Sequence, residues 1–202
     1  MKRNGKRIAA SAAVLAVVGS VVTLAGAIRG SGDPSIPATF HPRTFSWLQP
    51  GATPRGWSAS RLPGSPARLP VPPGWRGEAG DPGTRTEALR TPSGEFAGYL
   101  NATPRQGSES AGNWSEFRLD HNVDEGDREV RLLAGATDLR FRSGAGSCVL
   151  DSYLTDSGNR YREVACIVSG PAATTVIVGA AAPHHWAAEA PTIEQAINSF
   201  TT

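Results

Sequence analysis

The chain has 202 residues, of which 39% are hydrophobic and 19% charged, and its formal net charge is +2. Four bases in the first seven residues account for this excess, because the rest of the chain has sixteen basic and eighteen acidic residues. The chain beyond them therefore lacks the basic character of a nucleic-acid-binding protein, and it is long enough for one buried core.

The N-terminal segment has the pattern of an export signal. Lys2, Arg3, Lys6 and Arg7 precede an uncharged apolar run that extends to residue 28. About 20 apolar residues can span a bilayer, whereas the small residues at 25–27 offer a cleavage site. We expect residues 1–28 to be a signal peptide or a signal anchor, with retention slightly favoured, and everything after them to lie outside the cytoplasm.

Composition also indicates the source and the domain boundaries. Lysine occurs only at positions 2 and 6, while alanine, glycine and proline are abundant, which is typical of a GC-rich bacterial genome such as that of an actinobacterium. Residues 29–43 read as a Pro/Gly/Ser-rich tether and residues 44–202 as one extracytoplasmic α/β domain. The tryptophans between 45 and 75 place that stretch in the domain, with short extended pieces near 57–62 and 67–71.

The middle of the chain predicts a hairpin, a helix and a further strand pair. Residues 85–90 and 95–102 flank a Pro-Ser-Gly turn. Asn113 followed by Glu116 is a helix-capping pattern, and the helix that follows carries His121, which we interpret as a core or boundary histidine. Residues 129–133 and 138–142 are expected to pair around a turn at Gly135.

The two cysteines lie on a predicted hairpin of residues 148–155 and 159–168. A three-residue loop ending in Gly158 places Cys148 opposite Cys166, at a Cα separation of roughly 4.5 Å that a disulfide can bridge. The alternative is a catalytic Cys148 with His184 or His185 as its base, but no local signature of a cysteine peptidase is present. We therefore predict a disulfide and no catalytic residue.

The same register places Asp151 opposite Glu163. Like charges directly across a strand pair are unfavourable. The sequence leaves two explanations open: a β-bulge that shifts one carboxylate, or a cation or basic partner held between the two.

The C-terminal region predicts a buried strand and a second helix. Residues 174–182 are almost entirely apolar, so both faces of this strand must be covered. Thr192 and Gln195 form a capping box before an apolar helical stripe. His184 and His185 precede this helix in a strand-like turn, where adjacent side chains diverge, and we expect no metal site and no cofactor.

These elements predict an α+β fold: a single domain with an antiparallel β-sheet meander covered by two helices, on opposite faces or together with the proline-rich edge. This order, with the phrase Leu-Pro-Val-Pro-Pro-Gly-Trp at 69–75 and Trp186 before the last helix, resembles the PsbP-like α/β/α sandwich domains that actinobacteria export. The resemblance spans about residues 55–202. It implies an accessory or binding role and supplies no catalytic residue.

The remaining candidate site is a set of arginines and tyrosines on the central strands: Arg140, Arg142, Tyr153, Arg160, Tyr161 and Arg162. Arginine binds carboxylate and phosphate bidentately, and cell envelopes supply both groups. Strand alternation already implies that the six side chains cannot all converge. We expect a non-catalytic binding or accessory domain at the bacterial cell envelope, in contact with an envelope protein or an anionic envelope component. An envelope hydrolase or transferase and a structural subunit of an envelope assembly are the alternatives.

Overall fold

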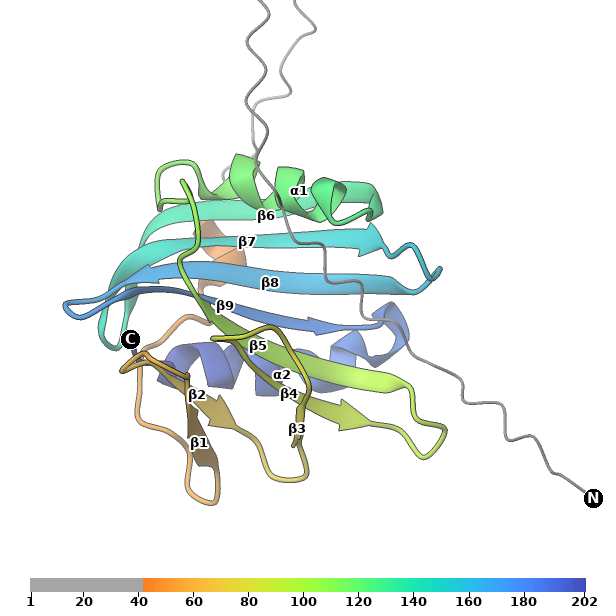
Figure 1. The fold of residues 1–202 in the computed structure, drawn as a ribbon, viewed down its shortest axis with the longest axis horizontal. Coiled ribbons are helices and arrows are strands. Elements are labelled where there is room, and N and C mark those ends of the chain that lie inside the picture. Colours follow the sequence, from red (N-terminus) through yellow and green to blue (C-terminus); the bar gives the residue numbers. More distant parts are fainter. Residues whose placement is uncertain (1–41) are drawn as a thin grey trace, which may run out of the picture. The chain divides into compact units, whose positions relative to one another are not determined.

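The structure of the chain, a computed structural model, describes residues 42–202 (Figure 1). The predicted signal segment and most of the predicted tether lie outside the described residues. Among the residues that the structure describes, no helix is long and apolar enough to cross a membrane.

The described part contains a short 3-10 turn, nine strands and two α-helices. In chain order these are η1 (Pro42–Phe45), β1 (Ser58–Arg61), β2 (Arg68–Val71), β3 (Arg76–Glu78), β4 (Arg85–Arg90), β5 (Phe96–Pro104), α1 (Trp114–Asp124), β6 (Arg128–Phe141), β7 (Gly144–Leu154), β8 (Arg160–Ser169), β9 (Thr174–Ala181) and α2 (Pro183–Ser199).

Seven of the strands form one antiparallel sheet in the order β3-β4-β5-β9-β8-β7-β6, while β1 and β2 pair separately. The last strand, β9, lies between β5 and β8, and every residue of it after Thr174 is buried. The predicted α+β class with an antiparallel sheet and two helices is confirmed. The strand order itself is new, because the sequence does not specify which strands are neighbours.

The two helices cover opposite faces of the sheet. Helix α1 packs on β6 and β7, and α2 packs on β9 and β5 (Figure 1). Alternate strand residues accordingly enter two separate apolar clusters. The α1 side contains Trp114, Val149, Ala165, Ile167, Val176 and Val178. The α2 side includes Cys148, Cys166, Ile177, Ile193, Ile197 and Phe200.

The proline-rich segment completes the cover on the α2 side. Phe45, Leu62, Leu69 and Trp75 are buried in the same cluster as the apolar face of α2. The extended pieces predicted there are β1 and β2. An antiparallel bridge between Arg68 and Thr201 ties this segment to the residues that follow α2.

The cysteine hairpin has the predicted register. Thr155 donates its backbone N–H to the carbonyl of Asn159 at 2.8 Å, and Gly158 has φ of 85°, as the three-residue loop requires. Cys148 lies opposite Cys166, and the two form a disulfide with a Cα separation of 4.1 Å. Both side chains are fully buried on the α2 side of the sheet.

The predicted strand pair around Gly135 is wrong. Residues 128–141 form one continuous edge strand, β6, whose pairing with β7 is interrupted at three places. Glu129 and Asp138 adopt positive φ at 53° and 57°, so these irregularities let the strand bend without ending. Gly135 instead lies close beneath α1, where a Cβ would meet Ser115 Oγ at 2.9 Å.

The predicted start of the last helix is also wrong. Helix α2 begins at Pro183, nine residues before Thr192, because proline is well tolerated in the first turn of a helix. Pro191 lies inside the helix and has no N–H to donate to the carbonyl of Ala187, four residues earlier. Both residues are exposed to solvent. His184 and His185 therefore belong to the first turn of α2 and not to a strand-like turn.

Candidate functional site

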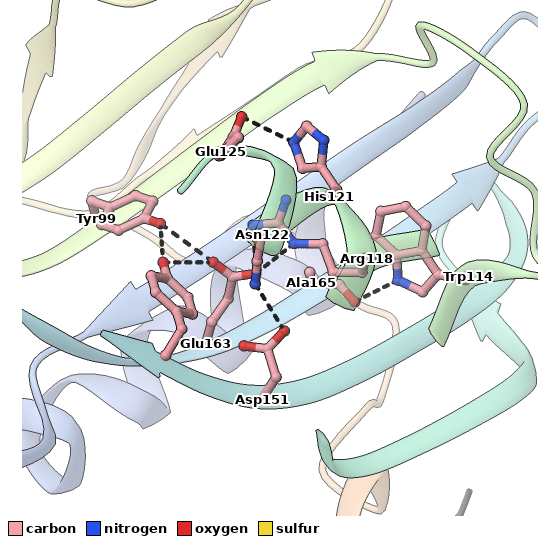
Figure 2. Close-up of polar contacts among 10 residues, drawn as sticks. Tyr99, Trp114, Arg118, His121, Asn122, Glu125, Asp151, Glu163 and Ala165 are labelled. Atoms are coloured by element: carbon pink, nitrogen blue, oxygen red, sulfur yellow. Dashed lines mark hydrogen bonds and ion pairs between the residues drawn. The ribbon is translucent and has the colours of Figure 1, made fainter. Parts of the chain in front are cut away.

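A buried polar cluster lies between α1 and the sheet (Figure 2). Three residues of α1 spaced four apart, Trp114, Arg118 and Asn122, lie on the helix face that meets the sheet. The indole N–H of Trp114 donates to the carbonyl of Ala165 on β8 at 2.9 Å, in a fully buried position. This bond ties the first turn of the helix to β8, and the next two turns lie near the carboxyl groups of the hairpin.

The cluster is centred on the carboxylate of Glu163, which is completely inaccessible to solvent. Arg118 donates to Glu163 Oε1 from Nε and Nη2, each at 2.7 Å. The phenol of Tyr153 donates to Glu163 Oε2 at 3.0 Å, and that of Tyr99 donates to the same oxygen at 3.3 Å. Both carboxylate oxygens are therefore bonded, which offsets the cost of burying the charge.

Burial and the Glu163 charge determine the protonation of its partners. Desolvation, followed by the Glu163 carboxylate, raises the pKa of Tyr99 and that of Tyr153 well above the ordinary value, so both phenols stay neutral donors. Desolvation opposes the charge of Arg118, but Glu163 more than compensates and raises the pKa of the guanidinium. Arg118 and Glu163 thus form a buried salt bridge.

The second carboxyl group, Asp151, lies directly opposite Glu163 with no shift in the register of β7 and β8. A bulge is therefore excluded as the way these two residues avoid each other. The basic partner that the sequence left as the alternative is Arg118 of the same chain.

Asp151 has too few donors to be an ionised group. Among the described residues its carboxyl group accepts one hydrogen bond, from the amide of Asn122 to Oδ2 at 3.5 Å, and Asp151 Oδ1 and Asn122 Oδ1 are both buried without a partner. Burial, followed by the Glu163 charge, raises the pKa of Asp151 to about 8. A proton on Asp151 supplies a further donor at a place where two buried oxygens have no partner. At neutral pH the cluster then holds one cation, one anion and one neutral acid.

The residues proposed from the sequence do not assemble into one patch. Tyr153 is buried in the cluster around Glu163, and Arg160 is paired with Glu129 at the exposed end of the hairpin. Arg162 alternates to the α2 side, where its guanidinium lies 5.3 Å from the ring of Trp186.

The two other proposed arginines lie far from this end of the sheet. Arg140 and Arg142 are exposed at the turn between β6 and β7, at the other end of the strands. Within residues 42–202 neither side chain takes part in an ion pair. They are the only members of the predicted set that keep guanidinium groups both exposed and unpaired.

Sequence reasoning missed Arg118, Asn122 and Tyr99 as cluster members. The spacing of Trp114, Arg118 and Asn122 along one helical face was visible, and it became informative only with the opposed Asp151 and Glu163. Tyr99 was not detectable, because its position beside β9 and β8 depends on the strand order. His121 pairs at 3.1 Å with Glu125, the residue that caps the C-terminal end of α1, and takes no part in the cluster.

Comparisons with known proteins support the fold alone. The sequence matches no protein-family model, and the comparison with curated proteins also gives no match. Among solved structures, cyanobacterial PsbP (CyanoP) from Synechocystis sp. PCC 6803 matches with a TM-score of 0.53 at 13% identity, over 72% of this chain and 92% of that one. The domain therefore has a PsbP-like fold.

Two further structures have lower scores. PA94 of Pseudomonas aeruginosa, a protein of unknown function, matches with a TM-score of 0.48 at 13% identity, over 72% of this chain and 96% of that one. The Ran-binding protein Mog1p of Saccharomyces cerevisiae matches with a TM-score of 0.46 at 13% identity, over 70% and 87% of the two chains.

We predict that Arg118→Met lowers the free energy of unfolding by about 3–5 kcal/mol, because it leaves the Glu163 carboxylate buried without its cation. The double variant Arg118→Met/Glu163→Gln should recover much of this loss. Urea unfolding monitored by tryptophan fluorescence measures both. Arg160→Met, which breaks the exposed pair with Glu129, is the control and should change stability little. A loss for Arg118→Met no larger than that of the control would contradict the assignment.

The raised pKa of Asp151 predicts a specific pH dependence of stability. The folded state holds this proton up to about pH 8, whereas the unfolded chain releases it near pH 4. The free energy of unfolding should therefore fall as pH rises through this window, by up to about 1.4 kcal/mol per pH unit, and level off above it. In Asp151→Asn this component should disappear, so the difference between the two proteins isolates it. Identical pH profiles would refute the protonated state.

Proposed function

We propose that this chain is an exported, non-catalytic binding or accessory domain of the bacterial cell envelope. Its N-terminal segment either anchors it in the membrane or is cleaved to release it. One observation carries the proposal: the side chains that could be reactive are already bonded to other groups inside the protein. Cys148, the candidate nucleophile, is bonded to Cys166 and fully buried. A closed disulfide also suits an oxidising compartment outside the cytoplasm.

The buried cluster argues against the alternative of an envelope hydrolase. A carboxyl group with a raised pKa beside a second carboxylate is a pattern found in acid–base active sites. Catalysis also needs the group to reach a substrate. Asp151 and Glu163 are completely inaccessible to solvent. The side chains that contact Glu163 belong to α1 and to the sheet, so they already occupy the space around its carboxylate. We infer that the cluster holds α1 in place and does not act on a ligand.

The surface best suited to a partner is the turn between β6 and β7. Arg140 is the second-last residue of β6, and Arg142 is the first residue of the turn that follows it, so the two arginines belong to one short segment. Both are exposed, while Leu139 and Phe141 face the protein. Two unpaired guanidinium groups in this arrangement suit an anionic envelope component with carboxylate or phosphate groups.

Export can be tested on the full chain produced in a bacterial host with its own N-terminus. We expect a protease that cannot cross the membrane to digest residues 42–202 in intact spheroplasts, while a cytoplasmic marker survives. The two cysteines should resist alkylation in the unfolded protein unless a reductant is added first. Protection from the protease, together with thiols that alkylate without reduction, would overturn the proposed location.

Binding to an anionic component can be tested by co-sedimentation of the detergent-solubilised full chain with purified cell walls at increasing salt. Arg140→Gln/Arg142→Gln should reduce the bound fraction several-fold and weaken its salt dependence. The matched control is Arg90→Gln/Arg160→Gln, which removes the same charge from arginines already paired with Glu78 and Glu129. Equal binding by the two variants would contradict recognition of an anionic component by Arg140 and Arg142, and a protein would remain as the class of partner.

A further inference from the structure

The first turn of α2 and the hairpin turn between β4 and β5 bring three metal-ligating side chains together. These are His184 and His185 of the helix and Glu95 of the turn. One possible ligand atom from each residue lies within 4.8 Å of the ligand atoms of the other two. His184 Nε2 is 3.3 Å from Glu95 Oε1, and the centroids of the two imidazole rings are 4.2 Å apart. The helical start of α2 thus corrects the expectation that the adjacent histidines diverge.

These distances are close to those of a zinc site. Nitrogen and carboxylate ligands bind Zn²⁺ at about 2.0–2.2 Å, so two ligand atoms at tetrahedral positions lie roughly 3.4 Å apart. The separation of His184 from Glu95 already has this value. A small side-chain rotation would bring the remaining ligand atoms from 4.8 Å or less into the same range.

The backbone on both sides of the group is held in place. Thr91 donates its N–H to the carbonyl of Glu95 at 2.9 Å, and Glu95 donates its own N–H to Thr91 Oγ1 at 3.2 Å. Gly94 between them has φ of 88°, which favours glycine. On the helix, Pro183 restricts the first turn, and the N–H of His185 donates to the carbonyl of Ala182 at 2.9 Å.

The same part of the chain is open to solvent. The side chains of His184 and Glu95 are 63% and 48% exposed, so an ion can enter without opening the core. Two imidazoles and one carboxylate form a donor set that suits Zn²⁺ better than Mg²⁺ or Ca²⁺, which prefer oxygen ligands. Three protein ligands leave a fourth position for water or for a group on another molecule.

We propose that Glu95, His184 and His185 form a surface Zn²⁺ site with an open coordination position. This site joins the β4–β5 turn to the start of α2. It is independent of the buried cluster and of the exposed arginines, so its failure would leave the proposed envelope role untouched.

The test is Zn²⁺ binding by the full chain, purified in detergent without a histidine tag and stripped with EDTA. Isothermal titration should find one Zn²⁺ per chain. His184→Ala, His185→Ala and Glu95→Gln should each weaken binding by about 100-fold, since even loss of an outer-shell partner costs on the order of 10–100-fold in affinity. Zn²⁺ should also raise the midpoint of thermal unfolding of the wild-type chain, but not that of any of these three variants.

The matched control is His121→Ala, which removes a histidine that is paired with a carboxylate, Glu125, but has no third ligand within residues 42–202. It should bind Zn²⁺ as the wild type does. Co²⁺ in place of Zn²⁺ should give the visible absorption of a four-coordinate ion, which His184→Ala abolishes. Circular dichroism of each metal-free variant verifies that it is folded. Absence of binding, or binding that survives in His184→Ala/His185→Ala, would overturn the proposal.

Discussion

The fold on the α1 side depends on one buried ion pair, that of Arg118 with Glu163. Without the guanidinium, a fully buried carboxylate on β8 would face a second carboxyl group, Asp151, across an unshifted strand pair. Arg118 reaches this position because Trp114, one helical turn earlier, is hydrogen-bonded to β8. The position of α1 over the sheet and the charge state of the hairpin therefore determine each other.

The two faces of the sheet are stabilised by different means. On the α2 side, the disulfide and a continuous apolar cluster hold the strands, α2 and the proline-rich segment together. On the α1 side, the apolar cluster is smaller and lies next to the polar network. The proposed partner-binding arginines and the proposed metal ligands lie outside both. A partner or an ion could therefore bind without disturbing either core.

Much of the fold follows from short-range patterns, but the cluster does not. The loop ending in Gly158 fixes the register that joins Cys148 to Cys166, so the hairpin and the disulfide were predictable from sequence. Gly135 was misread as a turn, because sequence alone does not distinguish a turn glycine from a glycine in a strand that passes close beneath a helix. The start of α2 was missed because the capping box at Thr192 is a stronger local signal than Pro183.

The contacts of the cluster link β5, α1, β7 and β8, which no local pattern connects. The opposed carboxyl groups Asp151 and Glu163 were visible as a conflict. The structure places the basic side chain of Arg118 beside them, and burial raises the pKa of Asp151 so that it keeps its proton at neutral pH. Carbon-13 NMR of the side-chain carboxyl groups over a pH titration measures that proton directly. The carboxyl carbon of Asp151 should keep its protonated chemical shift at pH 6 and change with a midpoint near 8. A midpoint near 4, the ordinary value for aspartate, would contradict the account.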